Sequence, residues 1–245
     1  MKRILVLEDE AAIREFIVIN LQRGGYEVVQ AEDGAQALAE YAAAEGNFDV
    51  ALLDIMVPEI DGLEVCKQLR AQSAKIGIIM LTAKAQEMDK LNGLMNGADD
   101  YITKPFSPSE LSARVDAVYR RVALNDEAER RSTSHILHAG KDFTLDLRSH
   151  TLTRHSSKDG QIVNENIDLT QLEFQLMEYF FTNIGAALSR TDILERVWGT
   201  NYIGEEKIVD VNIRRLRMKL EKTPSNPQYL TTVWGRGYKW VTDGK

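Results

Sequence analysis

Five polar residues stand at, or directly after, the ends of short apolar runs in the first half of the chain. They are Glu8, Asp9, Asp54, Thr82 and Lys104. If each run is a strand of one parallel sheet, these side chains gather beyond the carboxyl ends of the strands, where ligands bind in such sheets. Carboxylate oxygens can hold Mg2+ there, one carboxylate can attack phosphorus, and a hydroxyl with an ammonium can neutralise phosphoryl oxygens. The set indicates metal-assisted phosphoryl transfer.

Each of these residues alone also has an ordinary structural interpretation. A strand-end Asp or Thr often caps the next helix, and Lys104 can be a solvated loop charge. The matching strand-end positions of all five favour one shared site. Crowded carboxylates also repel one another, which favours a bound divalent cation.

Alternating strands and helices are predicted to position these residues. Apolar runs predict strands at 4–7, 27–31, 50–53, 76–81 and 100–103. Helical patterns lie at 11–23, 35–44, 63–71, 86–96 and 108–121, the last opening with a capping box at 107–110. This alternation is typical of an α/β fold with a doubly wound, five-stranded parallel sheet of the flavodoxin-like type.

The pattern changes in the second half of the chain. Residues 123–134 lack apolar periodicity and are interpreted as a linker between a domain at 1–122 and another at 135–245. Short strands are expected at 143–147, 151–154 and 161–163, with a polar turn at 156–160. Helices are expected after capping boxes at 170–173 and 189–192 and at about 206–222, before a hairpin of 229–234 and 238–241. These elements predict an α+β winged helix-turn-helix domain.

Composition limits the class of protein. With 245 residues, 44% of them hydrophobic, the chain can build two cores. The apolar run at 4–7 is too short for a signal peptide or a membrane span, so we expect a cytoplasmic protein with no membrane partner. The single cysteine, Cys66, excludes an intramolecular disulfide and is interpreted as a core residue.

Charge is unevenly spread along the chain. The net charge is −7, and residues 1–122 hold 13 Lys and Arg against 20 Asp and Glu, whereas residues 135–245 hold 15 against 14. The stretch 207–222 has six basic and two acidic residues. An anionic partner is therefore expected at this stretch.

The same stretch forms an amphipathic helix when placed at about 100° per residue. One stripe, which must face the domain core, carries Val209, Ile213, Leu216 and Leu220. The opposite side carries Lys207, Val211, Arg214, Met218 and Lys222, with Arg215 at its edge. Outward apolar residues beside bases suit a DNA major groove, where they can meet thymine methyls while Arg reads guanine or grips phosphate.

Several segments of the first half resemble the receiver domains of the OmpR/PhoB family of two-component response regulators. The resemblance lies in 7–10, 53–58, 61–62, 81–83 and 97–106. It implies that Asp54 accepts a phosphoryl group from a sensor histidine kinase, and no enzymatic activity beyond this phosphotransfer and slow autodephosphorylation. Thr82 and Lys104 would contact the phosphoryl group, and Tyr101 would be an aromatic switch.

The resemblance also implies a metal site and a cis peptide bond. Mg2+ would be bound by Asp9, Asp54 and the Met56 carbonyl with help from Glu8, which stands where aspartate is commoner but keeps a carboxylate. The cis bond would join Lys104 to Pro105. All four histidines lie after residue 134, so the phosphoryl donor must come from another molecule.

Residues 170–240 are similar to the effector domain of this family, which implies binding to double-stranded DNA. Roles in DNA contact are expected for Lys207, Val211, Asn212, Arg214, Arg215, Arg217, Thr232 and Arg236, with Arg217 chiefly touching the DNA backbone. Asn212 stands where histidine is common, so base preference cannot be transferred. The loop 199–206 matches the segment implicated in contact with RNA polymerase, although a surface loop without partners is an equal alternative.

The family also implies a homodimer on phosphorylation, built on the fourth helix, fifth strand and fifth helix of the receiver. Three pairs are expected across its interface: Lys90 with Glu110, Asp100 with Arg114, and Asp99 with Arg121. Solvated charges are the alternative, since exposed pairs contribute only about 0 to 1 kcal/mol each.

Two other functions share part of this pattern. A phosphohydrolase of the haloacid-dehalogenase type needs a second aspartate two residues after its nucleophile, and Met56 stands there. A DNA-binding protein with a vestigial receiver is disfavoured by the intact Asp9, Asp54, Thr82 and Lys104.

The terminal hairpin departs from the common family pattern, with Trp234 where arginine is frequent and Arg236 where a small or apolar residue is usual. In one interpretation Trp234 packs within the hairpin and Arg236 is a solvated turn residue. In the other, Arg236 reaches the minor groove or a phosphate, aided by the flanking glycines.

Overall fold

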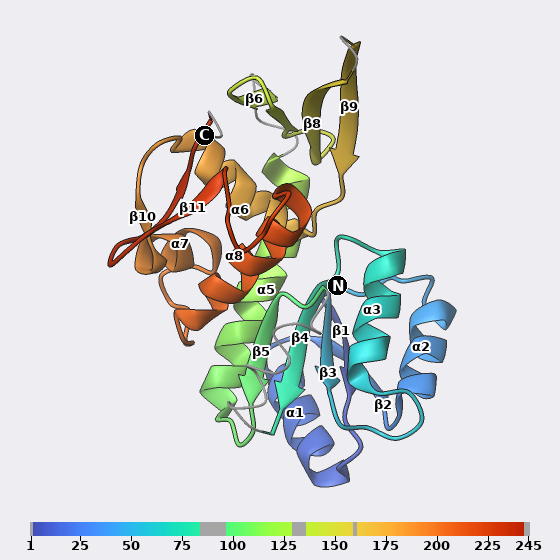
Figure 1. Cartoon of the computed structure of the whole chain (residues 1–245). Helices are drawn as coiled ribbons and strands as arrows, with labels where there is room; N and C mark the ends of the chain where they lie inside the picture. Colours follow the sequence, from blue (N-terminus) through green and yellow to red (C-terminus); the bar gives the residue numbers. More distant parts are fainter. Residues whose placement is uncertain (1, 84–96, 129–135, 159–160, 243–245) are drawn as a thin grey trace. The chain divides into compact units, whose positions relative to one another are not determined.

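The computed structural model describes residues 2–83, 97–128, 136–158 and 161–242 (Figure 1). The chain divides into two compact units, Met1–Ala123 and Leu124–Lys245. Each unit has its own sheet and core, and the two are described separately below.

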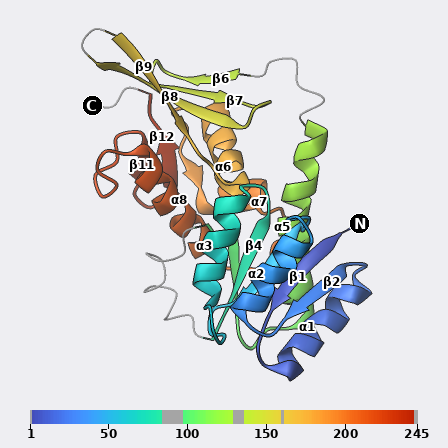
Figure 2. The ribbon, with the colours of Figure 1, turned by 90° about the vertical axis from the view of Figure 1, so that its right-hand side faces the viewer.

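The first unit is built on a five-stranded parallel sheet in the order β2-β1-β3-β4-β5. Its strands are β1 (Arg3–Leu7), β2 (Glu27–Ala31), β3 (Val50–Asp54), β4 (Gly77–Thr82) and β5 (Asp100–Thr103). Its described helices are α1 (Ala11–Arg23), α2 (Gly34–Ala43), α3 (Gly62–Gln72) and α5 (Pro108–Ala128). Helices cover both faces of the sheet, with α1 and α5 on one and α2 and α3 on the other (Figures 1 and 2). The predicted doubly wound α/β fold is confirmed.

Burial explains why these segments form this sheet. Strands β3 and β4 are buried along their whole length, as expected of strands covered on both faces. Apolar residues of α1 and α5, among them Ile17, Leu21 and Val115, pack with Ile4 and Val6 of β1 in one core cluster. The sheet thus brings the ends of β1, β3, β4 and β5 to one edge.

Helix α5 is longer than expected. It continues to Ala128, so residues 123–128 are helical although they were interpreted as the start of the linker. These residues include good helix formers such as Ala and Leu, which can extend a helix even where the sequence shows no apolar periodicity. The rest of that linker and the whole of the helix expected at 86–96 lie outside the described residues.

The described residues of the second unit form two antiparallel sheets and three helices. One sheet contains β6 (Ile136–Ala139), β7 (Phe143–Asp146), β8 (Thr151–Lys158) and β9 (Gln161–Ile167). The helices are α6 (Gln171–Thr182), α7 (Arg190–Val197) and α8 (Lys207–Leu220). The other sheet has the order β10-β12-β11, formed by Leu188–Ser189, Gly237–Trp240 and Leu230–Val233. The predicted winged helix is confirmed.

Three local expectations for this unit need correction or completion. Strands β6 and β10 were not predicted, since each has only a few residues. The turn expected at 156–160 is partly wrong, because Ser156 pairs with Val163 and residues 156–158 belong to β8.

The three predicted capping boxes are not all completely formed. Those at Thr170 with Glu173 and Ser189 with Asp192 are fully formed. At the start of α5 only half of the motif is present: Ser107 Oγ accepts from the Glu110 N–H, while the Glu110 carboxylate binds Arg114.

Candidate phosphoacceptor site and DNA-binding surfaces

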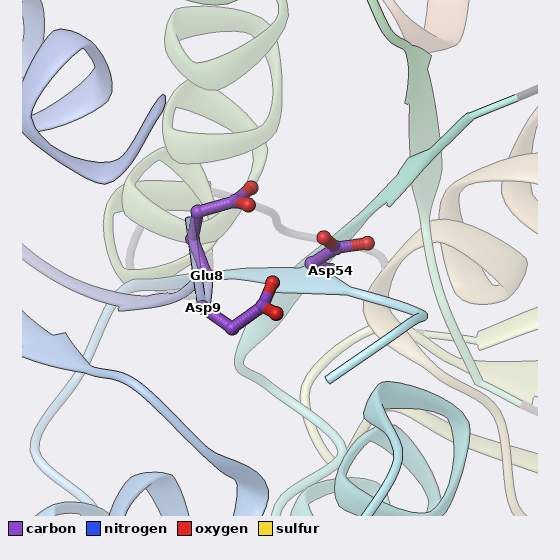
Figure 3. Close-up of side chains that lie close together, drawn as sticks. All are labelled: Glu8, Asp9 and Asp54. Carbon is purple, nitrogen blue, oxygen red and sulfur yellow. The ribbon is translucent and has the colours of Figure 1, made fainter. Parts of the chain in front are cut away.

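Three carboxylates meet at the carboxyl edge of the parallel sheet (Figure 3). Glu8 and Asp9 follow β1 directly, and Asp54 is the last residue of β3. One oxygen from each lies within 4.8 Å of the others. Glu8 and Asp54 are buried, whereas Asp9 is exposed, which leaves the cluster open to an ion from solvent. Hard oxygen ligands in this arrangement fit Mg2+.

Lys104 connects two of these carboxylates. Its Nζ lies 2.6 Å from Asp54 Oδ2 and 2.7 Å from Glu8 Oε2. Its backbone N–H donates to the Thr82 carbonyl at 2.7 Å, which fixes the segment after β5 beside the end of β4. The expected cis bond between Lys104 and Pro105 is present. The ammonium is therefore held where a phosphoryl group on Asp54 would need positive charge.

Burial and charge act in opposite directions at this cluster. Burial raises the pKa of Glu8 to about 7, helped by the Asp54 charge and opposed by the hydrogen bond and charge of Lys104. Burial alone lowers the pKa of Lys104, but its hydrogen bonds to Asp54 and Glu8 outweigh this, so the pKa is raised and the ammonium stays charged.

Thr82 completes the site with an unused hydroxyl. It ends β4 beside β3, where Leu81 is in register with Asp54. Its Oγ1 is buried and has no hydrogen-bond partner in the described part of the chain. A buried hydroxyl without a partner costs about 1 to 3 kcal/mol, so a ligand oxygen at this place would be favourable.

Met56 was expected to offer its carbonyl to the metal. Its backbone N–H donates to Asp54 Oδ1 at 3.2 Å, so this residue lies beside the cluster, and its side chain is largely exposed. The structure does not test the role of its carbonyl.

Two residues that position the site were missed by the sequence interpretation. Arg14 on α1 donates to the carbonyls of Glu8 and Asp9 at 2.7 and 3.1 Å and pairs with Glu32. A Cβ at Gly62 would lie 1.9 Å from the Asp54 carbonyl oxygen, so only glycine allows α3 to begin there. Gly62 belongs to a segment of family resemblance, but no pattern singled out Arg14.

Comparisons with known proteins agree with both units. Residues 4–116 match the family described as response regulator receiver domain, and residues 164–240 match the family described as transcriptional regulatory protein, C terminal. The sensory transduction protein RegX3 of Mycolicibacterium smegmatis is 42% identical over 98% of this chain and 99% of its own length. The chain belongs to the OmpR/PhoB family of response regulators.

Further relatives of this response regulator extend the likeness. The alkaline phosphatase synthesis transcriptional regulatory protein PhoP of Bacillus subtilis is 41% identical over 97% of this chain and 96% of its own. A solved structure of a RitR mutant has a TM-score of 0.72 at 29% identity, covering 98% of this chain and 99% of that one. The protein is thus a two-component response regulator with a DNA-binding domain that regulates transcription. No helix in the described ranges is long and apolar enough to cross a membrane.

The DNA-binding domain of the response regulator presents only part of the expected surface on α8. Lys207, Arg214 and Met218 are exposed as expected. Val211 and Asn212 are buried, so the outward position expected for Val211 is wrong. The buried arc of α8 includes Ile208 and its i+3 and i+4 neighbours, and is wider than the four-residue stripe.

Other expected DNA contacts on α8 are engaged within the domain. The Asn212 amide donates to the Ile208 carbonyl at 2.9 Å, and Arg215 donates to Asn212 Oδ1 at 3.3 Å. Arg217 Nε donates to the Leu230 carbonyl and its Nη2 to Thr232 Oγ1, both at 2.8 Å. Arg217 and Thr232 therefore join α8 to the base of the β11–β12 hairpin, called the wing below.

The wing tip differs from one of the two interpretations of its sequence. Trp234 has 91% of its surface exposed, so it does not pack within the hairpin. Arg236 is also exposed. That interpretation of Trp234 is wrong: the residue follows the last residue of β11, in a turn closed by the bond from the Arg236 N–H to the Val233 carbonyl, and its ring is in solvent.

Residues expected at the receiver dimer interface already have partners within the chain. Arg114 lies 3.1 Å from Asp100 and 3.0 Å from Glu110. Asp99 pairs with Arg70 at 2.9 Å and accepts from the Ile78 N–H. Arg121 Nε donates to the Ala117 carbonyl, and Lys90 lies outside the described residues. Any pairing across a dimer must exchange or share these contacts.

Proposed function

We propose that Mg2+-dependent phosphorylation of Asp54 by a sensor histidine kinase promotes dimerisation of the receiver and sequence-specific DNA binding, in the cytoplasm. The observation that carries the proposal is the contact of Lys104 Nζ with both Asp54 and Glu8, beside the unpartnered hydroxyl of Thr82. This arrangement supplies one carboxylate as nucleophile, a cation in contact with it, and a hydroxyl that has no partner among the described residues.

In the proposed step an Asp54 carboxylate oxygen attacks the phosphorus of a phosphohistidine on the kinase. The P–O bond to Asp54 forms, the P–N bond breaks, and the bond's electron pair stays on the imidazole nitrogen of the kinase. Lys104 and Thr82 then bind phosphoryl oxygens. When bound by Glu8, Asp9, Asp54 and the Met56 carbonyl, Mg2+ supplies further positive charge. Water attack on the acyl phosphate later gives slow autodephosphorylation.

The phosphorylated site is proposed to act on the dimer surface through Thr82 and Tyr101. Tyr101 lies on β5 next to β4, and its carbonyl accepts a hydrogen bond from Arg114. Movement of Thr82 toward the phosphoryl group would free space for the ring of Tyr101 and disturb Arg114. The dimer pairs proposed above involve the same arginine.

Arg114→Glu is expected to weaken phosphorylation-dependent dimers about five- to tenfold, because it places like charges beside Asp100 and Glu110. Sedimentation velocity of the phosphorylated protein measures the change. Arg23→Glu, which reverses an exposed charge on α1, serves as the matched control. Unchanged dimerisation of a variant that still folds, as judged by thermal unfolding, would remove this surface from the proposal.

DNA is proposed to contact the exposed Lys207 and Arg214 of α8, together with Arg215 and the wing residue Arg236. Arg217 and Thr232 are proposed to hold the wing in position for the phosphate backbone. The loop between α7 and α8, residues 199–206, is proposed to contact RNA polymerase. Two domains of one dimer would occupy tandem half-sites about one helical turn apart.

Phosphorylation is expected to raise affinity for tandem half-sites by about a hundredfold, because dimerisation makes the second binding event intramolecular. The probe is a duplex selected by the phosphorylated protein from a randomised library. Fluorescence anisotropy would compare this duplex with one that carries a single half-site, where little change is expected. Equal affinity for the tandem duplex with and without phosphate would favour the vestigial-receiver alternative.

A further inference from the structure

The wing tip carries an exposed tryptophan that no role described above requires. The chain has three tryptophans, of which Trp198 and Trp240 are fully buried while Trp234 is 91% exposed. Exposing a large ring to water is unfavourable, since burying such a side chain contributes about 1.5 to 3 kcal/mol. A ring held in solvent at the tip of a hairpin is therefore available to a partner.

The wing tip is a fixed support for this ring. The Arg236 N–H donates to the Val233 carbonyl at 2.9 Å and closes a four-residue turn, in which Gly235 takes a φ of 71°. Val233 and Gly237 are in register on the two strands. Gly237 lies so close to β10 that an added Cβ would be 2.0 Å from the Leu188 carbonyl oxygen. The turn and its neighbour strand thus fix where the ring emerges.

The wing is also fastened to α8. Arg217 donates to Leu230 and Thr232 on β11, and the Tyr238 hydroxyl on β12 donates to Asp210 Oδ1 at 2.7 Å. Arg190 on α7 donates to the same oxygen of Asp210 at 2.8 Å. These bonds join both strands of the wing to the helix that is proposed to enter the major groove. A partner bound to α8 therefore meets the wing tip in a set position.

Charge indicates what kind of partner this is. The hairpin 230–240 contains Arg236 and Lys239 and no acidic residue. Arg236 stands two positions from Trp234 and is exposed like it. A hairpin that carries an exposed aromatic ring and basic residues but no acidic residue suits a partner with many negative charges and some apolar surface. DNA does so in its minor groove, where deoxyribose walls lie between the two phosphate backbones.

We propose that Trp234 binds the minor groove beside the site read by α8, with its ring against deoxyribose and Arg236 supplying the charge to phosphate or groove. This inference rests on the proposed DNA-binding function. A single arginine at a wing tip could supply both packing area and positive charge. Here Trp234 would supply the packing area and Arg236 the charge, so separate substitutions can remove the apolar and the ionic part of the contact. Tryptophan contributes contact area and an indole N–H donor, but no release of counterions.

The test compares Trp234→Ala and Arg236→Ala on the duplex selected from a randomised library, at several salt concentrations. Trp234→Ala is expected to weaken binding roughly tenfold, within the range for aromatic contacts to nucleic acid, with an unchanged salt slope. Arg236→Ala is expected to lower the salt slope by about one. Ile162→Ala, which removes another exposed apolar side chain of this unit, is the matched control and should leave affinity unchanged.

Intrinsic fluorescence gives a second readout that depends on Trp234 itself. With Trp198 and Trp240 buried, acrylamide should quench mainly Trp234, and DNA should protect it. Trp234→Phe supplies the background signal of the buried pair. Binding by Trp234→Ala equal to wild type, or unprotected Trp234 in the DNA complex, would overturn the inference. Protection by RNA polymerase but not by DNA would also overturn it. Failure of the wild-type protein to select any duplex would instead contradict the proposed function.

Discussion

Asp54→Ala is expected to abolish labelling of the response regulator by a small phosphodonor in the presence of Mg2+, because it removes the nucleophile that Lys104 and Thr82 surround. Labelling is measured as a mass increase of the intact protein, followed by peptide mapping. Loss should be complete, since the other carboxylates of the cluster, Glu8 and Asp9, both follow β1, whereas Asp54 ends β3, the strand that pairs with the one carrying Thr82.

The variant should still fold, so loss of labelling can be assigned to chemistry. Lys104 keeps its pairing with Glu8 when Asp54 is removed, and no buried cation is left alone. Glu15→Ala removes an exposed carboxylate from α1 and should label as the wild type does. Full labelling of Asp54→Ala would show that the acceptor is another residue.

Arg70→Ala is expected to lower the free energy of unfolding of the first unit by about 3 to 5 kcal/mol. The Arg70 guanidinium makes six hydrogen-bond contacts with its five N–H groups, one of them shared, to the carbonyls of Ser73, Ala74, Ile76 and Gly97 and to Asp99 Oδ2. Its removal leaves the Asp99 carboxylate, which is buried, without its cation. Denaturation in urea, followed by circular dichroism, measures the loss.

Two controls separate charge from geometry at Arg70. Arg70→Lys keeps the charge but loses the forked donors, so an intermediate loss is expected. Arg23→Ala removes an exposed arginine of α1 and should change stability by less than about 0.5 kcal/mol. A loss at Arg70→Ala no larger than that at Arg23→Ala would contradict the role assigned to these hydrogen bonds.

Sequence patterns predicted the receiver well because its described helices bury one face against the sheet, while β3 and β4 are continuous apolar runs buried on both faces. Helix α1 and strand β5 have the bounds expected from their apolar residues. Helix α5 continues beyond its expected end, through residues that include good helix formers but lack the apolar periodicity used to place that end. The contacts of Arg70 with Gly97 and Asp99 could not be foreseen, since they join α3 to a segment far along the chain.

The acidic cluster was predicted from strand ends, whereas the DNA-binding surface was predicted only in part. Strand order alone brings Glu8, Asp54 and Lys104 together, so few assumptions were needed. On α8 the four residues predicted to face the core are buried, but Val211 and Asn212 are buried as well. The periodicity of one helix does not show how wide its buried face is, because that width depends on the elements packed beside it. For the wing two interpretations stayed open, and the one that packed Trp234 within the hairpin is wrong, since the side chain is exposed.

The bonds from Arg217 and Tyr238 fix the wing relative to α8. If α8 and the wing bind DNA as proposed, these bonds also set the spacing between the major-groove and minor-groove segments of a half-site. Inserting one base pair between those segments moves them apart by about 3.4 Å and turns one around the duplex relative to the other. Natural half-sites should therefore vary in base identity at this boundary but keep its length.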